Sequence, residues 1–216
     1  MKILGAINSR SLVWLAAALA AALFASSCVN KRTQTSGDLT VNARSNIFRA
    51  GTGGTDALGG GEPAPSVTFE ARAGTVLTFT SVTGRVSCCS GGDEFNDADG
   101  GTFAGGITNV ESAGGISGIT HPNKTMFLVG VFTDNKHPTG LGPARLDATS
   151  EENLAPALCQ TFFIGTGKGR RIEVPSTAKR LYLGFADASA FNGPPGAYDD
   201  NVGELKVAFS IESKAK

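Results

Sequence analysis

The sequence predicts an all-β protein, a single β-sandwich of jelly-roll type with very little helix. About eight runs rich in β-branched and aromatic residues alternate with turn signals along the chain. The 216 residues include 29 glycines and 9 prolines, and only 18% are charged, a composition that suits many tight turns. The chain shows neither an internal repeat nor a shift of composition that would mark a second domain. One sandwich is therefore the expected architecture.

Residues 1–27 have the features of a signal peptide. Two basic residues precede the apolar run 12–24, and the small residues 25–27 lead to Cys28. The apolar run is too short for a comfortable transmembrane anchor. This segment resembles a bacterial lipoprotein signal, in which Cys28 becomes the lipidated first residue, and ordinary cleavage nearby is the alternative. We therefore expect an outer-membrane lipoprotein held to the membrane by the lipid on Cys28, with a secreted or periplasmic protein as the alternative.

The charge of the chain argues against nucleic acid as a partner. Without Lys2 and Arg10, which leave with the signal peptide, acidic residues slightly outnumber basic ones. A basic surface is what binding to a phosphate backbone requires. An enzyme is not expected either, because the sequence offers no Ser-His-Asp arrangement and no apolar setting that would raise the pKa of a catalytic Glu.

The mature chain begins with a polar tether, residues 28–37, and the β-sandwich domain follows over residues 38–213. Residues 38–48 alternate well enough to predict a first strand. Two further β-runs, 66–71 and 75–82, are separated by a short Arg-Ala-Gly sequence, which predicts a hairpin.

The middle of the chain contains its most apolar run, residues 125–133, which predicts a central strand buried on both faces. Residues 150–158 form the only candidate helical turn. Residues 160–165 and 171–174 predict two more strands around a glycine-rich turn. Residues 105–160 as a whole indicate no function.

The C-terminal part predicts a hairpin with a cation site in its loop. Residues 180–185 and 204–211 are two strand runs, and the second alternates apolar and polar residues. The connecting loop carries Asp187, Asp199, Asp200 and Asn201. Because two paired strands cannot bury acidic residues between them, we expect this loop at an exposed edge. Carboxylate, amide and backbone oxygens on a tight loop are the ligands that calcium prefers, and a solvated loop without a ligand is the alternative.

A second acidic loop, residues 87–106, is rich in Gly and Asp and almost without apolar residues, so it is expected at the surface. Its acidic residues are Asp93, Glu94, Asp97 and Asp99. Such a loop could rim the cation site and accept hydrogen bonds from the hydroxyl groups of a ligand. A flexible solvated loop is the alternative.

The pairing of the cysteines stays open. If Cys28 carries lipid, Cys88, Cys89 and Cys159 remain, an odd number for an oxidising compartment. A bridge from Cys159 to one of the vicinal pair is the simplest pairing. A Cys88–Cys89 disulfide is rarer, although such rings can form stacking surfaces for ligands.

The segments LYLGFAD and GAYDDNVGELKVAFSI resemble the C-terminal part of the calcium-dependent galactose-binding lectins of the PA-I type. Those lectins are small jelly-roll sandwiches in which a calcium ion bridges protein oxygens and sugar hydroxyls. The resemblance implies that Asp187, Asp200 and Asn201 bind calcium through their side chains and Ala197 through its backbone carbonyl. Two differences are that the loop after Asp187 is longer here by several residues and that Asp replaces Asn at position 200.

A fainter likeness covers the sequence DEFNDADGG, which lies where those lectins carry a sugar-contacting loop. Asn96 takes the place of a sugar-contacting His and Asp99 that of a Gln, so galactose specificity does not follow. Together with Asp97 on the same loop and Tyr198, they are the candidate ligand-binding residues, and either Phe191 or Tyr198 could stack on the apolar face of the sugar. We expect a calcium-dependent, lectin-like surface lipoprotein whose partners are glycans or glycosylated surfaces. The alternative is a structural or adhesive envelope lipoprotein of the same fold that binds no sugar.

Overall fold

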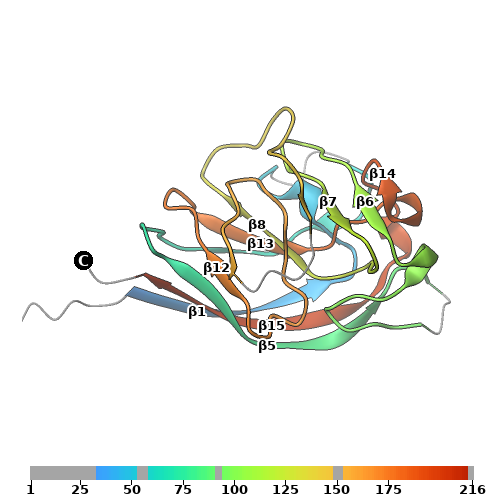
Figure 1. The fold of residues 1–216 in the computed structure, drawn as a ribbon, viewed down its shortest axis with the longest axis horizontal. Coiled ribbons are helices and arrows are strands. Elements are labelled where there is room, and N and C mark those ends of the chain that lie inside the picture. Colours follow the sequence, from blue (N-terminus) through green and yellow to red (C-terminus); the bar gives the residue numbers. More distant parts are fainter. Residues whose placement is uncertain (1–32, 53–57, 91–93, 148–152, 214–216) are drawn as a thin grey trace, which may run out of the picture. The chain divides into compact units, whose positions relative to one another are not determined.

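The computed structural model describes residues 33–52, 58–90, 94–147 and 153–213. These residues contain fifteen strands and four single-turn 3-10 helices, and the part of the chain described contains no α-helix. The predicted all-β sandwich is therefore confirmed (Figure 1). The predicted signal peptide, Cys28 and the first part of the tether lie outside the described residues. No helix within the described ranges is long and apolar enough to cross a membrane.

Three sheets and one short strand pair make up the domain. The five-stranded sheet has the order β1 (Thr33–Asn42), β15 (Val202–Ser213), β5 (Val76–Ser87), β12 (Arg171–Glu173) and β10 (Asn153–Leu154). The second sheet has the order β11 (Phe162–Phe163), β8 (Val129–Thr133), β13 (Arg180–Gly184) and β4 (Ser66–Thr68). The third has the order β14 (Asn192–Gly193), β6 (Thr108–Val110), β7 (Ile119–His121) and β9 (Leu146–Asp147), and the pair consists of β2 (Ser45–Asn46) and β3 (Glu62–Pro63).

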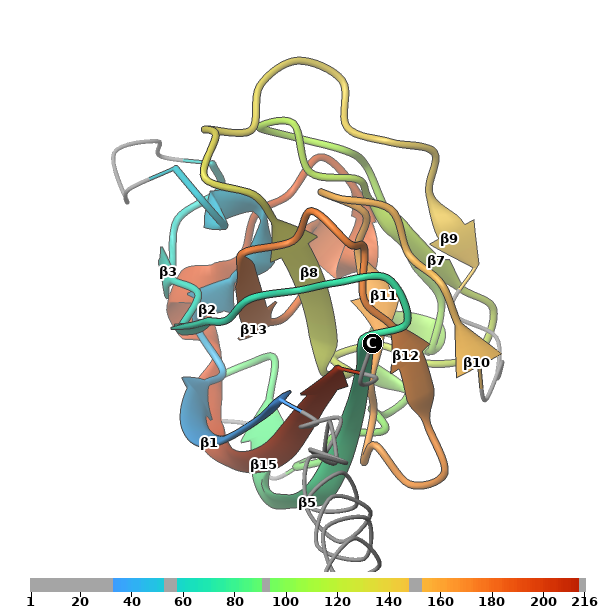
Figure 2. The ribbon, with the colours of Figure 1, turned by 90° about the vertical axis from the view of Figure 1, so that its left-hand side faces the viewer.

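The long strands β1, β15 and β5 form one layer, and β8 and β13 lie in the layer above it (Figures 1 and 2). On β15 the four apolar residues Leu205, Val207, Phe209 and Ile211 are all buried, as their alternation predicts. The β1–β15 ladder pairs Thr33 with Ser213 and continues to Asn42. Residues 33–37 therefore belong to β1, and their assignment to the tether is wrong. Paired backbone groups hold these polar residues in a strand that composition alone does not indicate.

The predicted central strand is confirmed over residues 129–133, whereas residues 125–128 are buried but precede the strand. All five residues of β8 are buried, and β8 pairs with β11 on one side and β13 on the other. Packing here is close enough to require glycine at position 130. A Cβ on Gly130 would lie 2.5 Å from Cζ of Phe162.

Both predicted hairpins are wrong. β13 pairs with β8 and β4, whereas β15 pairs with β1 and β5, so residues 185–201 cross from one sheet to the other. β4 and β5 are likewise in different sheets. The burial patterns agree with this separation, because β13 is buried on both faces, whereas β15 alternates between buried and exposed residues along much of its length.

Residues 105–160, for which the sequence indicates no function, contribute most of the third sheet. β6, β7 and β9 come from this segment, and β14 joins β6 in parallel. The predicted helical turn is wrong where it is described, because Asn153 and Leu154 form β10 beside β12. Residues 150–152 lie outside the described residues.

Candidate functional site

Strand register brings the two acidic loops together. In the antiparallel β5–β15 ladder, Val202 is opposite Ser87. The chain that follows β5 therefore lies beside the chain that precedes β15. As a result Cys88 and Cys89, at the start of the acidic loop 87–106, line the same pocket as Asp200, near the end of the loop that precedes β15. This pocket has a volume of about 420 Å³.

The connection from β13 to β15 leads away from Asp187 and later comes back beside it. After Asp187 the chain turns through η3 (Ser189–Phe191), and β14 pairs with β6. It returns where Ala188 bridges Pro195 and the amide of Gly196 donates to the carbonyl of Asp187 over 2.9 Å. The residues between Asp187 and Ala197 thus include β14, which belongs to the third sheet. Asp187 and Ala197 both line the pocket although ten positions separate them.

Asp187 lies at the base of this site with only 2% of its surface exposed. Its Oδ2 accepts a hydrogen bond from Nδ2 of Asn201 over 2.8 Å, and its Oδ1 accepts one from the amide of Ala188 over 2.7 Å. Burial raises the pKa of Asp187 from its usual 3.8 to about 7, although these two bonds act in the opposite direction. The charge of Asp200 adds to the rise. The prediction of an exposed acidic loop is therefore wrong for Asp187, whose partners allow burial.

Ala197 and Asp200 bracket η4 (Tyr198–Asp200) and are both exposed in the pocket. Ala197 has φ +64° and ψ +15°, a left-handed conformation that reverses the chain before η4. Three of the four predicted calcium ligands thus line one pocket. None of the described residues lining this pocket is basic, so its electrostatic potential favours a cation.

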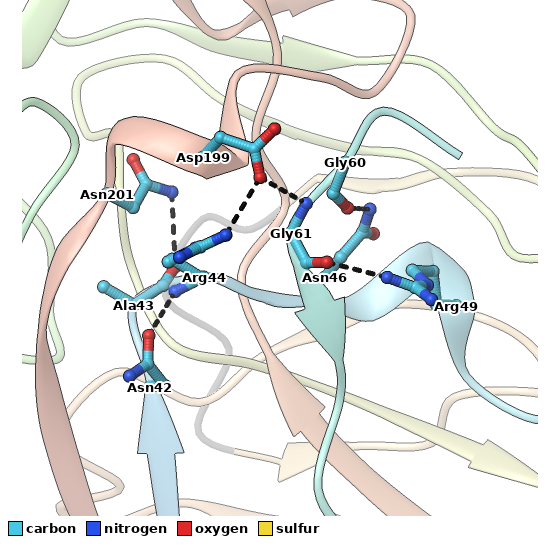
Figure 3. A network of polar contacts seen from close by, with 9 residues as sticks. All are labelled: Asn42, Ala43, Arg44, Asn46, Arg49, Gly60, Gly61, Asp199 and Asn201. Atoms are coloured by element: carbon cyan, nitrogen blue, oxygen red, sulfur yellow. Dashed lines mark hydrogen bonds and ion pairs between the residues drawn. The ribbon is translucent and has the colours of Figure 1, made fainter. Parts of the chain in front are cut away.

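Asn201, the fourth predicted ligand, lies directly behind Asp187. Besides its bond to Asp187, Nδ2 of Asn201 donates to the carbonyl of Ala43 over 3.2 Å (Figure 3). Its Oδ1 is buried and has no hydrogen-bond partner. Asn201 thus carries an unpaired amide oxygen, and it lies next to the Asp187 carboxyl group, whose pKa is raised by burial. These two features fit a site for a cation that prefers oxygen ligands.

Carboxylates alone do not form this site. Among the described residues, no three His, Cys, Asp or Glu side chains are grouped closely enough to hold a metal ion. Calcium in proteins is also bound by amide and backbone carbonyl oxygens, which such a grouping leaves out. The predicted set has this mixed character, with two carboxylates, one amide and one backbone carbonyl.

The four predicted ligand-binding residues do not line the pocket. Tyr198 is fully buried, and its hydroxyl donates to the carbonyl of Phe185 and accepts from the amide of Asp187, each over 3.0 Å. Burial raises the pKa of Tyr198 well above its usual value. Tyr198 therefore supports Asp187 from behind instead of presenting its ring to a ligand.

Asn96, Asp97 and Asp99 are used to hold the acidic loop in shape. Asn96 bridges Val86 through both backbone groups, and its Nδ2 donates to the carbonyl of Met126 over 3.0 Å. Oδ1 of Asp97 accepts from the amide of Asp99 over 2.9 Å. The Asp99 carboxylate accepts from the amide of Thr166 over 2.7 Å.

Other residues line the pocket in their place. The acidic loop contributes Glu94 and Thr102, the latter just before η2 (Phe103–Gly105), and η3 contributes Ser189 and Phe191. Two of them have a signal in the sequence, Glu94 as a member of the acidic cluster and Phe191 as a candidate stacking residue. The η2 and η3 turns reach the pocket through long-range packing, which no local pattern records.

The cysteine pairing is settled in favour of the rarer alternative. Cys88 and Cys89 form a disulfide, and Cys159 is free. Cys159 is placed elsewhere by backbone bonds, since its amide donates to Phe132 in β8 and its carbonyl accepts from Ser117. The simplest pairing, Cys159 with one of the vicinal residues, is therefore wrong.

A largely exposed polar network lies beside the pocket. One carboxylate oxygen of Asp199 accepts from Arg44 over 3.1 Å and from the amide of Gly61 over 3.0 Å (Figure 3). In the same network Asn46 donates to the carbonyl of Gly60 over 3.0 Å. Asp199 is thus a structural neighbour of the pocket and not one of its lining residues.

No protein family model, curated protein or solved structure shows a significant match to this chain.

Proposed function

We propose that this protein binds calcium at the pocket formed by Asp187, Ala197 and Asp200, with Asn201 behind it, and uses that site to bind carbohydrate. The observation that carries the proposal is the convergence of these groups. A nearly buried carboxylate and an exposed carboxylate line one pocket where strand register brings two loops together, and the residue behind the buried carboxylate carries an unpaired amide oxygen. A bound calcium would supply open coordination positions that vicinal sugar hydroxyls can fill.

The residues of the chain have separate tasks in this proposal. Asp187 and Asp200 provide negative charge, and Asn201 holds Asp187 in place through its Nδ2, while its buried Oδ1 has no hydrogen-bond partner. Glu94, Thr102 and Ser189 offer carboxylate and hydroxyl groups to the remaining polar atoms of a ligand. If the chain is a lipoprotein lipidated at Cys28, many copies on one membrane surface would offset weak binding at each single site.

The near-complete burial of Asp187 favours a second candidate. In that case the protein is a structural or adhesive envelope protein, and the cation only holds the loops in place. The two functions differ in what a sugar does. A sugar-binding site requires access to Asp200 and Ala197, which are exposed, whereas a structural cation requires only Asp187 and Asn201.

The test is binding of residues 29–216 to a glycan array in buffer with calcium and in buffer with a calcium chelator. We expect binding that needs calcium and is lost in Asp187→Ala plus Asp200→Ala. Asp199→Ala is the matched control, because Asp199 contacts Arg44 and Gly61 instead of the pocket. Calcium binding without any glycan binding would support the structural candidate and contradict the lectin-like one.

A further inference from the structure

The pocket contains a second kind of surface besides its acidic groups. Both members of the Cys88–Cys89 disulfide line it, with Cys88 buried and Cys89 exposed. Phe103 and Ala104 from η2 and Ala190 from η3 extend this apolar lining. The disulfide reaches the pocket because it follows β5 directly, opposite the residues that precede β15.

A bare cation needs no apolar lining, so this surface points to a larger ligand. Glu94, Asp187 and Asp200 in the same pocket disfavour an anion or a purely apolar molecule. A sugar ring combines the two required properties, since its hydroxyl groups project from the edge while its C–H groups form an apolar face. Sulfur is polarisable and packs well against such apolar groups.

We propose that the Cys88–Cys89 disulfide is a ligand-contacting wall of this pocket, which packs against the apolar face of a saccharide ring whose hydroxyl groups face the acidic residues. The inference rests on the proposed carbohydrate binding and adds the element that recognises the ring. It also makes the site sensitive to reduction. The bridge closes a small ring of adjacent residues, and breaking it frees both side chains to rotate and separates the two sulfurs that form the contact surface.

The reduction step needs an external thiol reductant. A dithiol such as dithiothreitol attacks one sulfur and forms a mixed disulfide, and its second thiol then closes the oxidised reagent. The S–S bond breaks, Cys88 and Cys89 together take up two electrons and two protons, and the reagent is oxidised to its cyclic disulfide. Asp187, Asp200 and Asn201 take no part, so calcium binding should survive.

The test measures saccharide and calcium affinity separately on the purified full chain. The probes are the methyl glycosides of galactose, mannose and fucose at millimolar concentration with calcium, followed by calcium alone. In Cys88→Ala plus Cys89→Ala, and in the reduced wild type, we expect saccharide affinity to fall about tenfold, which corresponds to about 1.4 kcal/mol. Calcium affinity should stay within about twofold. Cys159→Ala is the matched control, since its thiol is free and does not line the pocket.

Each result has a distinct meaning. Unchanged saccharide affinity in the double variant overturns the inference and leaves the proposed function standing. Loss of calcium affinity together with saccharide affinity also overturns it, because the disulfide would then position the cation site. A wild type that binds calcium but none of the three glycosides or any array glycan overturns the inference and the carbohydrate proposal together. The reduced wild type covers the case in which the double variant fails to fold.

Discussion

Replacing Asp187 with asparagine should stabilise the calcium-free protein at alkaline pH. Asp187 has a pKa of about 7 in the folded chain and 3.8 when unfolded. The folded state therefore binds more protons between these values, and the free energy of unfolding decreases as pH rises from about 4 to above 7. At about 1.36 kcal/mol for each pKa unit, a rise of about 3 corresponds to about 4 kcal/mol at pH 8 to 9.

The substitution Asp187→Asn removes the free-energy cost of a buried charge and introduces a smaller cost in hydrogen bonding. An amide at position 187 keeps an oxygen for the amide of Ala188, but its nitrogen faces Nδ2 of Asn201. If the Asn201 amide turns over to pair with it, its bond to Ala43 is lost, at about 1 kcal/mol. We therefore expect Asp187→Asn to be about 3 kcal/mol more stable than the wild type at pH 8.5, and equal or slightly less stable at pH 4.

Urea unfolding of residues 29–216 with a calcium chelator, followed by far-ultraviolet circular dichroism, measures this difference. The chain's one tryptophan, Trp14, lies in the predicted signal peptide, so tryptophan fluorescence does not report on the domain. Asp199→Asn is the control, since the Asp199 side chain is 74% exposed, and it should show no comparable pH-dependent gain. A variant at position 187 that is destabilised equally at both pH values would refute the reasoning, because the buried charge would then carry no cost.

Three further predictions follow from the same structure. Tyr198→Phe should lower the free energy of unfolding by about 1 to 3 kcal/mol, measured by urea unfolding, because it leaves the buried carbonyl of Phe185 and amide of Asp187 without their shared partner; a loss near zero would contradict that role. Gly130→Ala should cost about 1 to 3 kcal/mol in thermal or urea unfolding, because the new Cβ would overlap the ring of Phe162, and an unchanged stability would show that the core can adjust. A thiol assay on residues 29–216, denatured without reductant, should find one thiol per chain, that of Cys159. In the folded protein this thiol should react slowly, because burial raises its pKa. Three reactive thiols in the denatured chain would contradict the vicinal disulfide.

Local pattern in the sequence was sufficient for individual strands. The alternation of Leu205, Val207, Phe209 and Ile211 predicts which face of β15 is buried, and the apolar run ending at Thr133 predicts the central strand. Which strands pair could not be predicted, because β5 reaches β15 over a long separation while β13 and β15, close in sequence, lie in different sheets. Long-range packing decides this, and no single segment records it.

In the candidate site, too, some features could be predicted from the sequence and others could not. Asp187, Ala197 and Asp200 were predicted from the resemblance and line one pocket. The burial of Asp187 could not be predicted, because its compensating partners, Tyr198 and Asn201, are 11 and 14 residues further along the chain. Asn96 and Asp99 were chosen by position in an acidic loop, but their side chains bond to the backbone of Met126 and Thr166, outside that loop.

The most direct test of the cation site is calorimetric titration of residues 29–216 with calcium at pH 8, where Asp187 is ionised. We expect one calcium per chain in the wild type and in Asp199→Ala, and no binding in Asp187→Ala plus Asp200→Ala. A wild type that takes up no calcium at millimolar concentration, or a double variant that binds it as the wild type does, would contradict the account.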